Sequence, residues 1–373
     1  MKKFCKIALV IFTLFSVYIF NMFGQTSPES DFEVVLTDDG TGAVITGYNG
    51  NGGNVIIPDT IQGFPVKEIG DLAFNGKWGT NFGYYNNKLI IQTPHSITNV
   101  IIPDSVEKIG AYAFVGGNFQ NIKLPASLKR IGYSAFKSCA MLQNLEFPDS
   151  LEILENGAFS DCHSLQTVKF PKSLKTIGDY TFWQCKSLKS VELYDFVEKI
   201  VKKAFSLCHS LQTVKLSNSL KIINDRAFFN CGIISIEIPD SVEEIGVGAF
   251  ENTNLITLKL PQPPVEIHGG AFRNSEIKEL TIMGGAVFFG DYYEDGYETR
   301  RYDKICYYTF YDCNNLESIV VGTMKNMPSE FVSSKSLKNI IFKSPDTVVK
   351  NDTFNCPNLT LSTQVEIRKH IQQ

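Results

Sequence analysis

The sequence has few charged residues, and its basic residues form no tract. Asp, Glu, Lys and Arg together make up 20% of the 373 residues, and the formal net charge at pH 7 is −4. A protein that binds nucleic acid needs a basic face to neutralise phosphates, so we expect no nucleic-acid partner. Aromatic residues, at 12%, are too frequent for a disordered chain.

Long apolar runs are also missing, with one exception at the N-terminus. Three lysines precede the uncharged run Ile7–Phe20, and small residues follow it around Gly24. This layout is typical of a secretory signal peptide over residues 1–24, with an uncleaved membrane anchor as the alternative. Cleavage would change the formal charge from −4 to −7, because the segment holds three lysines and no acid. We expect a secreted, cell-surface or periplasmic protein without a stable membrane span.

A repeat of 22 or 23 residues occupies most of the chain. Its anchor is a phenylalanine, usually preceded by alanine or threonine, and a proline or a substitute stands eleven residues before most anchors. A fixed period of this length is the signature of a solenoid, in which each coil stacks only on its neighbours. The twelve anchors are Phe74, Phe114, Phe136, Phe159, Phe182, Phe205, Phe228, Phe250, Phe272, Phe310, Phe331 and Phe354.

The pattern within one repeat predicts its local structure. In SLQTVKFP the alternation places Phe170 inside and Lys169 outside, which indicates a short strand. Pro171 ends the strand because it has no amide hydrogen to donate. Ile177 re-enters the core on the return path, and Phe182 fills the interior from a short helical or 3-10 corner.

The motifs IPDSVEKIGAYAF, SLKRIGYSAFKSC and IPDSVEEIGVGAF resemble those of the BspA-type leucine-rich repeat family of secreted and surface proteins. The resemblance covers about residues 31–361 and implies a repeat solenoid, a curved stack of short parallel strands in about 12 coils. The expected organisation is a signal peptide at 1–24, an N-terminal β cap at 25–54, a solenoid at 55–361 with insertions near 75–95 and 284–299, and a C-terminal cap or tail at 362–373.

Two Cys-His pairs could suggest a metal or catalytic site, but both fall on the repeat. His163 and His209 follow cysteines that recur three residues after the anchor. The two histidines are two coils apart, about 10 Å at the ~4.8 Å spacing of strands, which is too far for them to share a zinc ion. No acid or amide recurs with them, as a Cys-His nucleophile would require. We therefore predict a protein without metal, cofactor or catalytic residues.

The recurrent cysteines are Cys139, Cys162, Cys185, Cys208, Cys231 and Cys313. We expect them to be buried free thiols, because cysteine buries readily and parallel side chains on a ladder suit a disulfide poorly. Disulfides are the alternative. Cys306 replaces the glycine of the repeat and could pair with Cys313 or Cys356.

Opposite charges alternate along the outward column beside the proline. We expect a self-neutralising ladder that fixes the register of the strands, with a groove for a charged ligand as the alternative. The members of this charge column are Lys123, Glu146, Lys169, Glu192, Lys215, Glu237 and Lys259.

Two aromatic insertions interrupt the period, and they hold the candidate binding residues. Insertions in a solenoid leave the stack as loops, often on the binding face, and Tyr and Trp often dominate interface energy. Loops that cover the sheet edge are the alternative. The candidates are Trp78, Tyr84 and Tyr85 in the first insertion and Phe289, Tyr292, Tyr293 and Tyr297 in the second.

The resemblance implies a secreted, non-catalytic, adhesin-like binding protein. Its expected partner is a protein of the host matrix or cell surface, and we expect the chain to be a monomer. Two alternatives stay open. One is a glycan-binding protein that uses the same aromatic insertions, and the other is a structural envelope protein without a soluble ligand.

Overall fold

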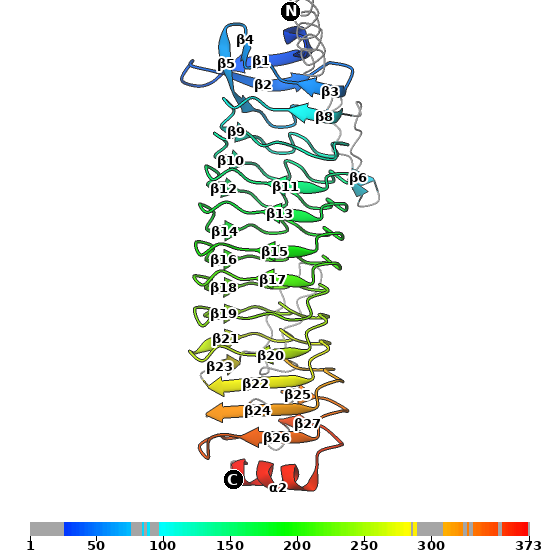
Figure 1. Ribbon diagram of the computed structural model, residues 1–373, viewed down its shortest axis with the longest axis vertical. Coiled ribbons are helices and arrows are strands. Elements are labelled where there is room, and N and C mark those ends of the chain that lie inside the picture. The colour runs from blue at the N-terminus through cyan, green and yellow to red at the C-terminus, as the bar shows by residue number, and fades with distance from the viewer. Residues whose placement is uncertain are drawn as a thin grey trace, which may run out of the picture.

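The computed structural model describes residues 26–75, 84–85, 88–89, 97–284, 286–288, 309–323, 327, 331–349 and 353–371. Over these residues the chain is a parallel β-solenoid of about 11 turns with little helix. Figure 1 shows the turns stacked into one long column, with β1 (Phe32–Leu36) near one end and α2 (Leu361–His370) at the other. The repeat solenoid predicted from the anchor phenylalanines is therefore confirmed.

The first part of each coil contributes to one parallel ladder. In its middle strands a buried apolar residue stands between two exposed polar residues, as at Val168 between Thr167 and Lys169. The strands pair in register, so equivalent residues of successive coils lie side by side. The strands of this first ladder are β3 (Gly53–Ile56), β8 (Ile97–Ile101), β11 (Asn144–Glu146), β13 (Thr167–Lys169), β15 (Ser190–Glu192), β17 (Thr213–Lys215), β20 (Thr257–Lys259), β22 (Glu279–Gly284), β24 (Ser318–Thr323) and β26 (Asn339–Phe342).

The return path of each coil forms a second parallel ladder, where the sequence indicates only apolar residues that re-enter the core. Most of its strands have two residues, the second of which is buried, as at Ile177 and Ile200. The strands of this second ladder are β2 (Ala43–Tyr48), β5 (Phe64–Ile69), β9 (Lys108–Ile109), β10 (Arg130–Ile131), β12 (Ile153–Leu154), β14 (Thr176–Ile177), β16 (Lys199–Ile200), β18 (Ile222–Ile223), β19 (Glu244–Ile245), β21 (Val265–Ile267) and β23 (Ala286–Phe288).

The anchor phenylalanines form a continuous stack inside the column. Neighbouring rings are nearly parallel, with centroids 5.0 Å apart for Phe136 and Phe159 and 5.4 Å apart for Phe205 and Phe228. The stacked arrangement runs from Phe74 to Phe310 and ends where Phe310 meets Phe331 edge-on. Parallel offset rings contribute beyond the burial of their area. One coil cannot enclose such a ring, so the stack explains why neighbouring coils are needed.

The corners that carry these rings are turns, where the sequence predicts short helical or 3-10 segments. From the coil of Phe114 to that of Phe272, each corner has a left-handed residue two positions before the anchor and another two positions after it, such as Tyr180 (φ 55°) and Gln184 (φ 58°) around Phe182. Residues other than glycine are strained in this conformation. The N–H groups of all three residues donate to carbonyls of the next coil, at 2.8–3.0 Å. These intercoil hydrogen bonds offset the strain.

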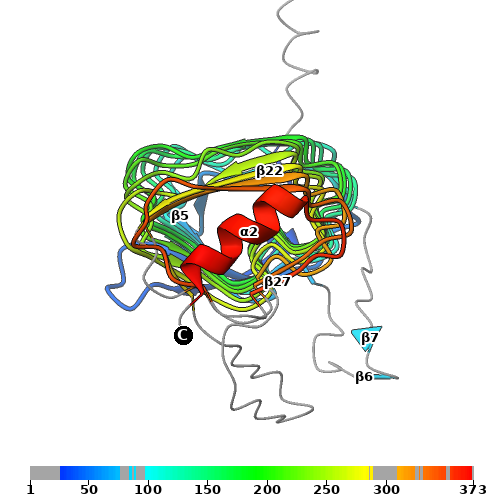
Figure 2. The same cartoon turned by 90° about the horizontal axis from the view of Figure 1, so that it is seen from below.

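The remaining elements include β1, β4 and α2 at the ends of the column (Figures 1 and 2). β1 pairs antiparallel with β2, β4 pairs antiparallel with β5, and α2 lies across the C-terminal end (Figure 2). Thr360 begins α2 by accepting a hydrogen bond from the N–H of Thr363 at 3.3 Å. Within the ranges given above, no helix is long and apolar enough to cross a membrane. These remaining elements are η1 (Glu29–Asp31), β1 (Phe32–Leu36), β4 (Thr60–Ile61), β6 (Tyr84–Tyr85), β7 (Lys88–Leu89), β25 (Val332–Ser333), β27 (Phe354–Asn355) and α2 (Leu361–His370).

Candidate functional site

The recurrent cysteines lie in the core and connect neighbouring coils of the stack. The Sγ of Cys162 donates to the carbonyl oxygen of Phe136 in the preceding coil at 3.3 Å, and Cys208 reaches Phe182 in the same way at 3.2 Å. Burial raises the pKa of the Cys162 and Cys208 thiols, and that of Cys313 to about 11. A protonated thiol is a poor nucleophile. The described cysteines are free, whereas Cys5 and Cys306 lie outside the described residues.

The two histidines of the Cys-His pairs contact the backbone of the next coil. His163 Nδ1 lies 3.0 Å from the carbonyl oxygen of Gln184, and His209 Nδ1 lies 3.1 Å from that of Asn230. Each imidazole ring is therefore directed at the backbone of the next coil and not at the other histidine. Across the part of the chain that the structure describes, no three His, Cys, Asp or Glu side chains gather in a way that could hold a metal ion.

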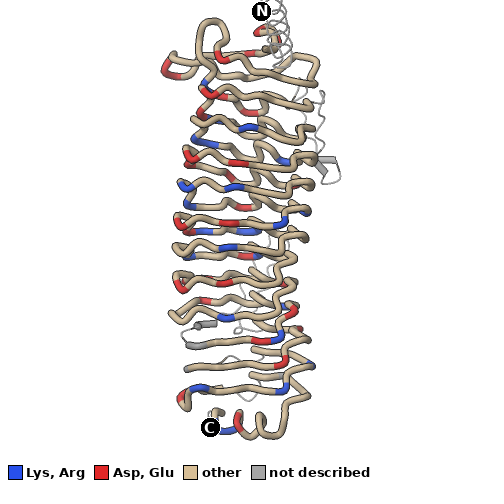
Figure 3. The backbone as a smooth tube through the Cα atoms, in the orientation of Figure 1, with Lys and Arg blue, Asp and Glu red and all other residues tan. Residues whose placement is uncertain are grey.

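The charge column forms discrete pairs. Lys169 Nζ lies 2.5 Å from Glu146 Oε1, and Lys215 Nζ lies 2.6 Å from Glu192 Oε1, so each lysine reaches back to the preceding coil. The contact with Glu146 raises the pKa of Lys169. Figure 3 shows both signs of charge interleaved along the column. Among the described residues these are the two ion pairs between members of the charge column. Lys123, Glu237 and Lys259 occupy the equivalent positions of their own coils.

The aromatic insertions contribute little to the described structure. Tyr84 and Tyr85 form β6, which pairs antiparallel with β7, and their side chains are not described. The five other candidates lie outside the described residues: Trp78, Phe289, Tyr292, Tyr293 and Tyr297.

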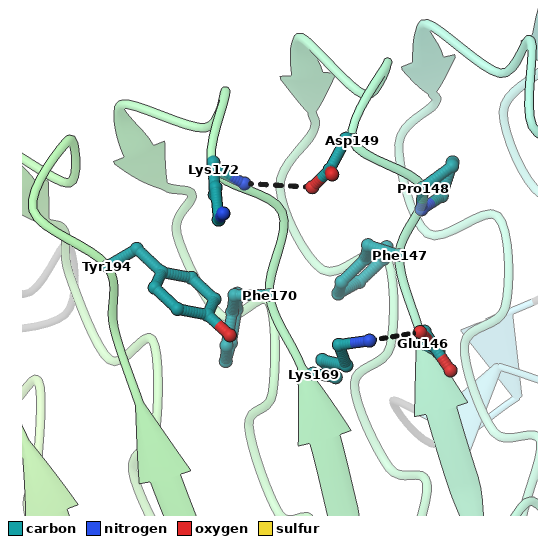
Figure 4. Close-up of a pocket in the computed structure, with 8 residues that line it drawn as sticks. All are labelled: Glu146, Phe147, Pro148, Asp149, Lys169, Phe170, Lys172 and Tyr194. Carbon is teal, nitrogen blue, oxygen red and sulfur yellow. Dashed lines mark hydrogen bonds and ion pairs between the residues drawn. The ribbon is translucent and has the colours of Figure 1, made fainter.

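A hollow of about 320 Å³ lies at the ends of β11 and β13, and we call it the strand-end hollow. Its apolar lining includes Phe147 and Phe170, which are almost fully buried. Figure 4 shows the Lys169–Glu146 pair on one side of it and the ring of Tyr194 beside Phe170. The hollow thus combines an aromatic floor with a charged rim.

The opposite side of the rim carries a second pair of charges. Asp149 Oδ1 accepts a hydrogen bond from the backbone N–H of Lys172 at 3.4 Å, which leaves the ammonium group of Lys172 outside this contact (Figure 4). The rim therefore has two acidic and two basic side chains. A rim of this kind can meet a ligand surface that carries both signs of charge.

Tyr194 belongs to a coil that departs from the repeat at two positions. It occupies the place of Pro148 and Pro171, and Phe196 follows two residues later with 58% of its surface exposed. Tyr194 itself is partly buried and packs against the core. In the sequence, Tyr194 is one of the substitutes that stand in the proline position, eleven residues before the anchor Phe205. The replacement of the common PDS by YDF in this one coil is the sequence signal that could have identified Tyr194 as a candidate.

Comparison with known proteins gives a family match and similar structures. The family model described as BspA type leucine rich repeat region matches residues 91–206, 175–293 and 298–372, with six copies of the repeat. Comparison with curated proteins gave no match.

Three solved structures are among those similar to the chain. A leucine-rich repeat protein from Bacteroides ovatus is 19% identical, covers 88% of this chain and 80% of its own, and has a TM-score of 0.58. A leucine rich cell surface protein from Faecalibacterium prausnitzii is 20% identical, with 86% and 95% covered and a TM-score of 0.42. The pneumococcal vaccine antigen PcpA is 21% identical, with 94% and 97% covered and a TM-score of 0.48.

Proposed function

The chain belongs to the BspA-type leucine-rich repeat family, and from this premise we propose that it is a secreted, non-catalytic, adhesin-like binding protein. Its partner in this proposal is a protein of the host matrix or cell surface. A stack held by buried rings and intercoil hydrogen bonds presents its surface already formed. A preformed surface lowers the ordering cost of association.

The strand-end hollow is the observation that carries the proposal. Interface hot spots are typically aromatic anchors in desolvated positions, surrounded by a polar rim. Tyr194 beside the buried Phe170 has this character, and the Lys169–Glu146 pair lies on the rim. Phe196 lies two residues after Tyr194 in the chain and is exposed. This composition suits a protein partner that inserts an apolar side chain between charged neighbours.

A protein partner would contact the face of several coils around the hollow. A stable interface buries about 800 Å² on each partner, which requires several coils. The outward residues of β11 to β17 are small polar groups beside the charge column, such as Asn144, Thr167 and Ser190. Asn144 also accepts a hydrogen bond from the Thr167 hydroxyl at 2.7 Å, which holds this part of the surface in place.

Two further observations support binding and export over catalysis. The buried thiols are held protonated and the repeat histidines contact backbone carbonyls, so these groups are engaged in the stack. The apolar run after three N-terminal lysines supports secretion.

The experiment compares residues 25–373 with two proline variants by surface plasmon resonance on fibronectin, laminin and collagen. Tyr194→Pro restores the repeat residue and removes the aromatic ring from the hollow. Ser217→Pro makes the same restoration one coil later, outside the hollow, and serves as the matched control. We expect Tyr194→Pro to weaken binding about tenfold and Ser217→Pro to leave it unchanged. Equal binding by the parent and Tyr194→Pro would mean that the hollow is not part of the interface. Absence of binding to all three matrix proteins would count against a matrix partner.

The seven aromatic residues of the insertions remain proposed contacts. A variant in which 284–299 is replaced by a tight turn tests the second insertion on the same sensor surfaces. Loss of binding in this variant, with a cooperative melt retained, would support a contact role for Phe289, Tyr292, Tyr293 and Tyr297. The double replacement Tyr84→Ala and Tyr85→Ala tests the first insertion, and Trp78→Ala completes the set. Unchanged affinity in all three would leave the sheet face as the interface.

A further inference from the structure

We propose that a second hollow, on the corner side of the coils, binds one ring of a neutral saccharide. The hollow spans the corners of the coils anchored by Phe136, Phe159 and Phe182 and has a volume of about 370 Å³. This volume falls in the range of small-ligand sites. We call it the corner hollow. It does not share a lining residue with the strand-end hollow.

The corner hollow exists because the middle coil has small side chains. Gly157 and Ser160 occupy the positions that Tyr180 and Trp183 occupy in the next coil. The backbone is the same in both, since Gly157 and Tyr180 are left-handed with φ of 67° and 55°. Side-chain size alone therefore creates the hollow. Its floor is tight, because a Cβ added at Gly157 would lie 3.0 Å from the Ser134 hydroxyl oxygen.

Aromatic side chains line the hollow on both sides of this floor. Tyr133 lies in the preceding coil with 46% of its surface exposed, and Tyr180 and Trp183 lie in the following coil. Each side is a braced unit, because Tyr133 meets Tyr112 edge-on at 5.3 Å and Tyr180 meets Trp183 edge-on at 6.4 Å. Two coil spacings of ~4.8 Å separate the two sides, which leaves room for a ligand about one ring thick.

The polar groups between the aromatic sides are neutral in sum and held in place. Asn156 Oδ1 accepts a hydrogen bond from the backbone N–H of Asp179 at 3.0 Å, which fixes the amide next to that carboxylate. Asn156 Nδ2 in turn donates to Asp179 Oδ2 at 3.5 Å, so the amide keeps one free donor and the ionised carboxylate keeps several acceptor positions. The charged lining residues are Lys137 and Asp179, one of each sign, and Lys137 Nζ also lies 3.9 Å from Oδ2 of Asp161, which does not line the hollow. A neutral ligand with hydroxyl groups matches this donor and acceptor set.

The chemistry distinguishes a sugar from other occupants. Carbon-bound hydrogens on the face of a pyranose ring pack on aromatic side chains, and its peripheral hydroxyl groups suit carboxylate and amide partners. A purely apolar ligand would remove solvent from the remaining acceptor and donor positions of Asp179 and Asn156 without replacing it, which is costly. A charged ligand gains little from a lining whose opposite charges balance. A saccharide ring uses both kinds of surface.

The test uses tryptophan fluorescence in a Trp78→Phe background. The chain has two tryptophans, so Trp183 then reports alone on the corner hollow. The probes are maltotetraose, cellotetraose and mannotetraose, added to residues 25–373 carrying that substitution. We expect a saturable change in Trp183 emission with at least one of them. No change with any of the three would overturn the proposal.

Variants then locate the site. Ser160→Trp fills the floor with the residue that the next coil already carries, and Tyr133→Ala removes one aromatic side. We expect each substitution to weaken saccharide binding about tenfold, and isothermal titration calorimetry measures the affinity. Phe229→Ala is the matched control, because Phe229 holds the position of Trp183 two coils further on. Saccharide binding that survives both Ser160→Trp and Tyr133→Ala would place the site elsewhere and overturn the proposal.

The two proposals fail separately. Loss of saccharide binding in Ser160→Trp with matrix-protein binding intact would support two independent sites. A corner-hollow variant that loses protein binding, in a chain that binds none of the three saccharides, would make this hollow part of a protein interface and would overturn the saccharide proposal.

Discussion

Cys162 donates its thiol hydrogen to the carbonyl oxygen of Phe136, 3.3 Å away and one coil earlier. The same contact recurs from Cys139, Cys185, Cys208 and Cys231 to the carbonyls of the corresponding earlier anchors. Each thiol therefore links two successive coils beside the stack of anchor phenylalanines. The recurrence of cysteine in this chain has a structural cause, since a small apolar side chain with a weak donor fits that position.

Replacing Cys162 by alanine tests this role. The substitution removes the sulfur from a fully buried site and leaves the Phe136 carbonyl without its thiol partner. We expect the free energy of unfolding to fall by ~1–2 kcal/mol. Cys356→Ala is the control, because Cys356 is only partly buried and its contact with Val332 is long, at 3.8 Å. Denaturant titration measures both, and an equal loss in the two variants would contradict the assignment.

The buried thiols also predict a loss of stability at alkaline pH. Burial raises the pKa of Cys313 to about 11 and that of Cys162 and Cys208 as well. An unfolded thiol ionises near pH 8.5, so between that pH and the folded pKa the unfolded chain holds fewer protons than the folded one. The stabilisation is complete below about pH 8.5 and is lost as the pH rises toward 11. Unfolding curves at pH 7, 9 and 10 measure the slope.

Other groups also titrate in that range, so a matched variant is needed. Cys162→Ala combined with Cys208→Ala should flatten the decline between pH 8.5 and 10, because two of the shifted thiols are gone. An identical slope in parent and variant would mean that the thiols do not cause the alkaline sensitivity.

Leu207 is a large apolar residue in a left-handed corner position. It has φ of 64° two positions after Phe205, where Asn230 and Asn252 stand in later coils. Asparagine tolerates this conformation better than leucine, and β-branched residues tolerate it worst. We expect Leu207→Asn to raise the free energy of unfolding by ~0.5–1 kcal/mol and Leu207→Val to lower it. Thermal melting of the pair gives the sign, and an opposite ranking would contradict the strain argument.

The anchor ring of a central coil should dominate local stability. Phe205 is fully buried, with its ring centroid 5.4 Å from those of both Phe182 and Phe228. Phe205→Ala should cost ~3–5 kcal/mol because the stack cannot collapse around the lost ring. Phe196→Ala removes a ring that is 58% exposed in the same coil and should be close to neutral. Hydrogen exchange should locate the loss in the coils next to Phe205, since each coil contacts only its neighbours.

Some of the candidate surface could not be found from the sequence because it depends on neighbouring coils. Gly157 and Ser160 are unremarkable within their own coil and form a floor only because Tyr133 and Trp183 stand one coil to either side. The alternating charge column predicts that Lys169 can reach an acid in the coil before or after it. The structure pairs it with Glu146, and the same backward direction holds at Lys215.

The sequence by itself determined the solenoid, its period and the interior of each coil. These follow from one burial pattern repeated at a constant interval, and such a pattern is local enough to be read residue by residue. The tertiary structure alone decided the left-handed corners, the second ladder and the two hollows. Tyr180 and Gln184 adopt an unfavourable backbone only because the next coil supplies carbonyls for their N–H groups, and that coil lies about 22 residues away in the chain. Strain and hollows depend on contacts between coils, which no single repeat contains.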